Sequence, residues 1–144
     1  MMTTDPILDQ IREHGEATYP EECCGFLLGT AGDENHVTAL HQVPNRQEDQ
    51  RTHRYTITPA DYRTADAKAS ARGLDIVGIY HSHPDHPARP SETDLAEATF
   101  PGYTYVIVSV MEGTATDLTA WSLAPDRSTF HEQPVTVEAP RPST

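Results

Sequence analysis

Two periodicities of apolar residues run along this chain, one typical of helices and one typical of strands. Apolar residues spaced by three and four predict one helix from Asp5, the expected N-cap, to about Ala17, and another from Pro59 to about Arg72. Apolar runs and alternating segments predict strands at about residues 25–30, 36–43, 53–57, 74–80, 103–111 and 116–123. Strands interleaved with helices predict an α/β domain, and the short hairpin connections require a mixed central sheet.

Two polar segments interrupt the pattern. Residues 44–52 are charged and lack apolar periodicity, so they are predicted to form a loop. Residues 125–144 hold four of the twelve prolines and are predicted to form a tail, with one edge strand near 128–132 before it frays. The expectation is therefore a single domain over residues 1–124, followed by a proline-rich tail over residues 125–144.

The segment from His81 to Asp94 carries the clearest chemistry. Because side chains alternate along a strand, His81 and His83 project from one face at the C-terminal end of the 74–80 strand. Two imidazoles on one face can chelate a single zinc ion. The prolines that follow His83 cannot extend a strand ladder, so the chain is expected to pass into an ordered loop there.

A short helix is expected to begin after this loop. Ser91 is a good N-cap, and it places Asp94 at the third helical position, where a capping-box partner sits. Asp94 is thereby held near Ser91 and could turn outward as a third metal ligand. Two histidines and one carboxylate leave a fourth position open, which is typical of a catalytic zinc rather than a structural one. A general base, preferably a second carboxylate, would still be needed.

These residues resemble a family motif. His81-x-His83-Pro84 followed by Ser91-x-x-Asp94 is similar to the JAMM motif of the MPN+ (Mov34/PAD-1-like) zinc metallopeptidases, in their short prokaryotic form. The resemblance implies a cytidine-deaminase-like α-β-α sandwich. It also implies that His81, His83 and Asp94 bind one zinc ion, and that Ser91 steadies the oxyanion of the tetrahedral intermediate.

The resemblance extends upstream. Glu22-Cys23-Cys24-Gly25, ahead of an apolar run, is similar to the family's Glu-x-Cys-Gly segment. It implies Glu22 as the general base, with the adjacent Glu21 as the alternative. The small prokaryotic members act on ubiquitin-like or sulfur-carrier proteins, so the implied reaction is hydrolysis of a peptide, isopeptide or cysteine-adduct bond at a carrier's C-terminus. The loop at 44–52 is then a candidate substrate loop.

Composition narrows the classes of partner and location. The formal net charge of −12 disfavours nucleic acid and anionic membranes as partners. One hypothesis is that the acidic excess suits high salt, and equal folding and activity without salt would contradict it. No run of eighteen apolar residues and no signal-like N-terminus is present, so a cytoplasmic location is expected. The adjacent Cys23 and Cys24 are expected to be reduced and buried, because a disulfide between neighbours is strained.

Alternatives to this interpretation remain at two levels. His86 and Arg89 lie in the same loop and could contact substrate, although solvated loop residues are the more common case. At the level of function, the domain could be a non-catalytic interaction module stabilised by a structural metal, which would need a closed coordination shell. A zinc nucleoside deaminase would need His-x-Glu and Pro-Cys-x-x-Cys, and neither motif occurs. Oligomeric state is not predicted by the sequence.

Overall fold

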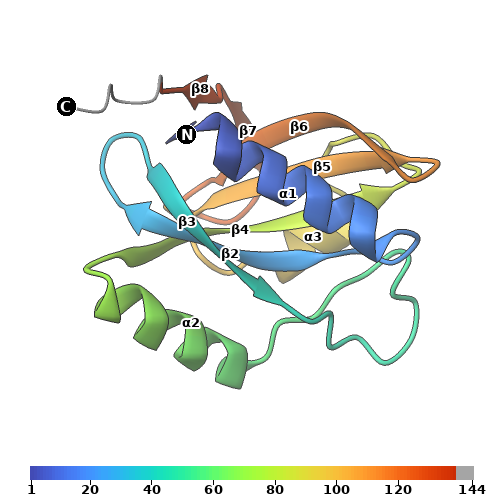
Figure 1. Ribbon diagram of the computed structural model, residues 1–144, viewed down its shortest axis with the longest axis horizontal. Coiled ribbons are helices and arrows are strands. Elements are labelled where there is room, and N and C mark those ends of the chain that lie inside the picture. Colours follow the sequence, from blue (N-terminus) through green and yellow to red (C-terminus); the bar gives the residue numbers. More distant parts are fainter. Residues whose placement is uncertain (139–144) are drawn as a thin grey trace.

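The computed structural model describes residues 1–138, and within this range eight strands form one sheet (Figure 1). The strand order is β7-β6-β5-β4-β2-β3-β1-β8. The strands are β1 (Met2–Thr3), β2 (Cys24–Thr30), β3 (His36–Val43), β4 (Asp75–Pro84), β5 (Thr104–Met111), β6 (Thr114–Leu123), β7 (Phe130–Gln133) and β8 (Thr136–Val137). The helices are α1 (Asp5–Thr18), α2 (Pro59–Ala71) and α3 (Glu92–Glu97).

The sheet is mixed and separates two apolar layers. β4 runs parallel to β5, and β1 runs parallel to both of its neighbours, whereas the other pairs are antiparallel. The helix α1 buries Ile7, Leu8 and Ile11 against one face, and α2 buries Ala65 and Ala69 against the other (Figure 1). The predicted α/β domain with a mixed central sheet between helices is confirmed.

A bulge in β4 decides which side chains face which layer. The pairing of β2 with β4 shifts between Leu27 and Leu28, so that Val77 is an extra residue on β4. After this shift, Ile79 faces the α2 layer and Tyr80 faces the α1 layer. Gly78 permits the bulge, because a Cβ there would lie 1.9 Å from the carbonyl oxygen of Thr104. His81 and His83 share the face of Ile79.

β4 continues further than the sequence predicted, as far as Pro84. Expecting the strand to end before this proline was wrong, because Pro84 still pairs with Val110 of β5. The amide of Ser82 points toward β2 and donates to the carbonyl of Cys23. By alternation the nitrogen of Pro84 points the same way, past the start of β2, where no ladder bond requires a donor.

Three further details differ from the sequence-based expectations. The N-cap of α1 is Thr4 rather than Asp5, which is already helical, and the Thr4 side chain makes no capping bond. Residues 53–57 form no strand: His53 lies in a turn, and residues 54–57 make single contacts with the side chain of Asn45 and the amide of Arg46 rather than a ladder. The tail adds β8 to the expected edge strand, because Met2 and Thr3 provide a partner for it. The expected fraying of the final residues, 139–144, lies outside the described range.

No helix in the described part of the chain combines the length and the apolarity needed to cross a membrane.

Candidate active site

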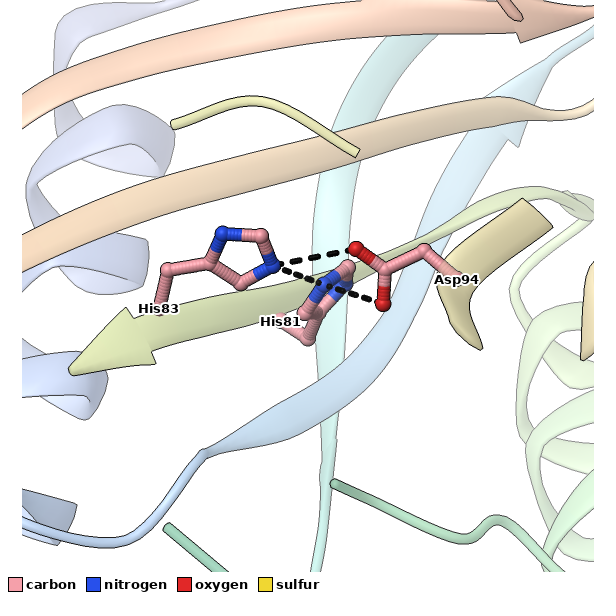
Figure 2. Close-up of side chains that lie close together, drawn as sticks. All are labelled: His81, His83 and Asp94. Atoms are coloured by element: carbon pink, nitrogen blue, oxygen red, sulfur yellow. Dashed lines mark hydrogen bonds and ion pairs between the residues drawn. The ribbon is translucent and has the colours of Figure 1, made fainter. Parts of the chain in front are cut away.

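Three side chains converge where β4 ends and α3 begins. Figure 2 shows His81 and His83 pointing from β4 toward Asp94 of α3. The two Nε2 atoms of the histidines lie 3.1 Å apart. The Asp94 carboxylate places one oxygen 3.0 Å from Nε2 of His83 and the other 3.3 Å from Nε2 of His81. The sequence-predicted ligand set is therefore assembled in space.

These spacings suit a metal ion better than a hydrogen-bond network. Ligand atoms about 2.0–2.1 Å from a tetrahedral zinc ion lie about 3.3 Å from one another. Both imidazoles direct Nε2 at the same point. For both rings to donate hydrogen bonds to the Asp94 carboxylate, each Nε2 would have to carry a proton, and these two protons would crowd each other. The donor set of two imidazoles and one carboxylate therefore fits zinc, with a fourth position left for substrate or water.

The orientation of the His83 ring is fixed by a hydrogen bond at Nδ1, the nitrogen that points away from Asp94. Its Nδ1 lies 2.9 Å from the carbonyl oxygen of Pro87, to which only an N–H can donate. The proton thus resides on Nδ1 and leaves the Nε2 lone pair free for a metal. On the other side of the pair, Tyr55 stacks on the ring of His81, with centroids 4.6 Å apart and planes at 26°.

The loop between His83 and Ser91 is held by side chains at several points. The hydroxyl of Ser109 donates to the carbonyl of His86, and the hydroxyl of Thr119 donates to the carbonyl of Ala88. The carboxylate of Asp85 accepts from the Tyr19 hydroxyl at 2.6 Å and from the amide of Glu112 at 2.8 Å. The expected ordered loop is confirmed, and its order comes mainly from side chains of other elements.

Ser91 and Asp94 form the predicted capping box of α3. The Ser91 hydroxyl accepts from the Asp94 amide at 3.0 Å, and the Asp94 carboxylate accepts from the Ser91 amide at 2.8 Å. The same Asp94 oxygen faces His83, so the cap and the ligand role coexist. The hydroxyl proton of Ser91 remains available to a group in the adjoining pocket.

The electrostatics of the three ligands reinforce one another. Burial alone would raise the pKa of Asp94, but the two imidazoles and the Ser91 amide outweigh it and hold the pKa well below its usual range. Burial likewise works to lower the pKa of His83, and the hydrogen bond and charge of Asp94 outweigh it, so the pKa of His83 is raised. The carboxylate is therefore ionised and ready to bind a cation at any ordinary pH.

Glu22 lies beside His83 because of strand register. Cys24 pairs with His81 across β2 and β4, so two residues further along the antiparallel chains Glu22 falls next to His83. Glu22 is only 4% exposed, and its Oε1 has no hydrogen-bond partner among the described residues. Both Glu22 and His83 line one pocket. The alternative, Glu21, does not line this pocket and instead forms an ion pair with Arg51 at 3.6 Å.

The environment of Glu22 is that of a proton carrier. Burial raises the pKa of its carboxyl to about 7, against the opposing effect of the two nearby imidazoles. A carboxyl that titrates near neutrality can both accept and return a proton under physiological conditions. An unpartnered oxygen and a raised pKa are common in catalytic carboxylates.

The pocket that Glu22 lines is also bordered by several nitrogen-bearing side chains. Its lining residues are Glu22, His53, His83, His86, Pro87, Arg89, Ser91 and Thr93. The rings of His53 and His86 have centroids 6.1 Å apart, one from the 44–58 loop and one from the loop after β4. His86 and Arg89 are both exposed, as expected for loop residues, yet both border the pocket.

Sequence reasoning missed two residues of this region. Tyr55 covers His81, and the sequence did contain a signal for it: in the alternating residues 53–57, every second side chain is expected to face inward. Asn45, which binds the main chain of Glu22, gave no local signal, because its partner is 23 positions away. The neighbouring Cys23 and Cys24 are free and buried, as predicted.

Known proteins resemble this chain over most of its length. A family model described as prokaryotic homologs of the JAB domain matches residues 4–124. A desampylase of Haloferax volcanii is 39% identical over 105 residues, which cover 73% of this chain and 74% of the desampylase. A CysO-cysteine peptidase of Mycobacterium tuberculosis is 29% identical over 125 residues, covering 86% of this chain and 82% of the peptidase.

Solved structures agree with the fold. A protein from Salinibacter ruber, solved in solution, is 62% identical, with a TM-score of 0.78 over 100% of this chain and 95% of that one. AF2198, a JAB1/MPN domain protein from Archaeoglobus fulgidus, has a TM-score of 0.62 at 20% identity, over 96% of this chain and 97% of that one. The second likeness concerns the fold alone.

Proposed function

This chain belongs to the prokaryotic homologs of the JAB domain, the JAMM/MPN+ peptidase family, and on that premise we propose that it is a zinc-dependent isopeptidase. Its substrate would be a ubiquitin-like or sulfur-carrier protein, cleaved at the bond that follows the carrier's C-terminal residue. The names of the related desampylase and CysO-cysteine peptidase support this substrate class. A cytoplasmic location is part of the same proposal.

One observation carries the catalytic proposal. Glu22 is buried, lacks a partner for Oε1 and shares a pocket with His83 and Ser91. A purely structural metal site would have no use for an unpartnered buried carboxyl, which costs stability. This favours an enzyme over an interaction module held together by a metal.

The chain's own groups divide the hydrolysis between them. His81, His83 and Asp94 would hold one zinc ion, which when bound would polarise the scissile carbonyl and lower the pKa of water toward about 7. Glu22 would take a proton from the attacking water and return it to the leaving amine. Ser91 would donate its hydroxyl hydrogen to the developing oxyanion, because its oxygen already accepts from the Asp94 amide.

An extended substrate tail has a place to lie. A groove beside His81 is lined by apolar and aromatic side chains, including those of Tyr55, Ile57, Tyr62 and Tyr105. The main-chain groups of Thr56 bind Asn45 and Arg46. Within residues 1–138 those of Tyr55 and Ile57 have no hydrogen-bond partner, so we propose that the tail pairs with this free edge.

The test is cleavage of defined conjugates followed by intact mass. Candidate carriers ending in Gly-Gly would be joined to lysine side chains, to a following peptide or to cysteine, and incubated with and without a chelator. The proposal expects zinc-dependent release of the intact carrier from at least one class. Glu22→Gln should lose turnover while keeping its zinc, and full activity of that variant would contradict the assignment of the base.

A further inference from the structure

The general-base carboxyl sits on a short stretch that belongs to no regular element. Glu22 precedes β2, and the strand ladder begins only at Cys24. Its side chain must nevertheless point steadily at one spot in the pocket. The contacts that fix the main chain of Glu22 are therefore different from those that surround its carboxyl.

Register places two residues on either side of Glu22. Cys24 pairs with Val43 of β3 on one side and with His81 of β4 on the other. Two residues beyond these pairs, Glu22 lies between Asn45 and His83. The strand ladder does not reach these residues. On this side of Glu22, the side chain of Asn45 therefore makes the hydrogen bond that the main chain of a neighbouring strand would otherwise make.

The side-chain amide of Asn45 is fully used. Its Nδ2 donates to the carbonyl of Glu22 at 3.1 Å and to the carbonyl of Arg54 at 2.9 Å. Its Oδ1 accepts from the amides of Gln47 at 3.0 Å and Thr56 at 3.2 Å. Asn45 thus binds the residue that carries the proposed base and the two residues on either side of Tyr55, which borders the substrate groove.

The opposite polar group of Glu22 is held by the same loop. The amide of Glu22 donates to the carbonyl of Arg51 at 2.7 Å. Both main-chain groups of Glu22 are therefore bound by residues 44–58, which otherwise have no regular structure (Figure 1). A small rotation of this stretch would swing the carboxyl away from the pocket.

We propose that Asn45 is a positioning residue, which sets the direction of the Glu22 carboxyl and couples it to the loop beside the substrate groove. This rests on the proposed function, because it takes Glu22 to be the base. Asn45 does not touch the reacting atoms; it acts through the carbonyl of Glu22 and through Thr56. Only a side chain with two donors and an acceptor in one plane makes all four contacts.

The chain offers a matched control. Asn35 also uses its side-chain amide as a bridge, donating to the carbonyls of Val77 and Gly102 and to the hydroxyl of Thr104. It lies at the other end of β4 from His81, in the β2–β3 turn. Substitution there removes a comparable set of hydrogen bonds without touching the residues around Glu22.

The experiment compares Asn45→Ala with Asn35→Ala, using a carrier conjugate that the wild type cleaves. The maximal rate at saturating substrate would be measured at pH 9, where Glu22 is ionised. Asn45→Ala should be slower by about ten- to a hundred-fold, as expected for a misplaced catalytic group, with zinc content unchanged. The maximal rate of Asn35→Ala should stay within about two-fold of wild type, even if its melting temperature falls as far as that of Asn45→Ala.

A second variant and a second readout keep the test decisive. Asn45→Asp keeps the volume and the acceptor but cannot donate to Glu22, so it should be slowed by a similar factor. Hydrogen exchange of the amide of Glu22 should quicken in both Asn45 variants and not in Asn35→Ala, whether or not a substrate is known. A maximal rate or an exchange rate equal to wild type in the Asn45 variants would overturn the proposal. If the wild type cleaves no carrier, it is the proposed function that fails, and the exchange result still judges Asn45.

Discussion

Two loops meet at the candidate active site, and they are held in different ways. The loop between His83 and Ser91 is fixed by the side chain of Tyr19, which follows α1, and by those of Ser109 in β5 and Thr119 in β6. The 44–58 loop, which surrounds Glu22, depends largely on Asn45 and on three ion pairs, Arg46–Asp61, Arg51–Glu21 and Arg54–Glu97. The candidate metal-binding half is thus held by hydrogen bonds from other elements, whereas the half that holds the proposed base relies on one asparagine and on ion pairs whose arginines are partly exposed.

The difference suggests where the site tolerates change. A metal site must stay within a few tenths of an ångström of one geometry, and redundant supports serve that need. A loop beside a substrate groove has to admit and release a protein tail, so partly exposed ion pairs, which are individually weak, suit it. We expect substitutions near the base to alter catalysis more than substitutions behind the metal ligands.

The largest expected effect on the base half is its pH dependence. Burial raises the pKa of Glu22 to about 7, and the group works as a base only when ionised. A bound zinc ion would lower this pKa, so kcat/KM should rise about ten-fold per pH unit in the acid range and level off at or below pH 7. A profile measured from pH 5 to 9 with zinc present checks this. A rate that falls as the pH rises from 5 to 7 would mean that the ionised carboxylate of Glu22 is not the base.

The same buried carboxyl should weaken the fold. Its pKa in the folded protein is about 7, above the ordinary value of 4.5, so folding favours its protonated form. Its contribution to stability is present at low pH and is lost as the pH rises from about 4.5 through 7. Metal-free Glu22→Gln should therefore exceed wild type in unfolding free energy by about 3 kcal/mol at pH 8 and by little at pH 4.

Denaturant unfolding of the two metal-free proteins at pH 4 and pH 8 measures this difference. An equal effect at both values would assign the stabilisation to packing rather than to the charge of Glu22.

A smaller effect is expected at the ion pair that joins the 44–58 loop to α3. Arg54 contacts Glu97 at 2.7 Å, and both side chains are about half exposed. Arg54→Ala should raise KM by about three- to five-fold by loosening the loop over the groove, with kcat little changed. Arg12→Ala, which breaks an exposed pair with Asp9 on α1, is the matched control and should leave KM unchanged.

The smallest effect is expected behind the metal ligands. Ser109→Ala removes one of the side-chain donors to the loop after β4 and should cost about 1 kcal/mol of stability. Because Thr119 and Asp85 still hold the loop, turnover should stay within about two-fold. A loss of zinc affinity as large as ten-fold in this variant would show that the supports are not redundant.

The comparison also separates what local sequence predicts from what it does not. The pair of His81 and His83 follows from the alternation of a strand, and the pair of Ser91 and Asp94 follows from the geometry of a helix cap. Both pairs can therefore be predicted from three or four consecutive residues. The helix α2 was equally legible, since Thr58 and Asp61 form its capping box.

The other half depends on contacts between distant positions. The roles of Asn45 and Tyr55 exist only because β3, β2 and β4 are neighbours, and no local period encodes that. The 53–57 segment shows the limit most clearly. Its sequence alternates like that of a strand, yet its main chain is bound by the side chain of Asn45 and by the single amide of Arg46, so it belongs to no sheet.

The bulge at Val77 has a consequence for anyone who would move this site elsewhere. Without that one extra residue, His81 and His83 would turn to the opposite side of the sheet and be packed among the side chains beneath α1. A transplanted His-Ser-His segment would therefore carry its chemistry only together with the backbone irregularity upstream and with Gly78, which makes room for it. The smallest segment that could be transferred with its function would therefore begin at Asp75, the start of β4, rather than at His81.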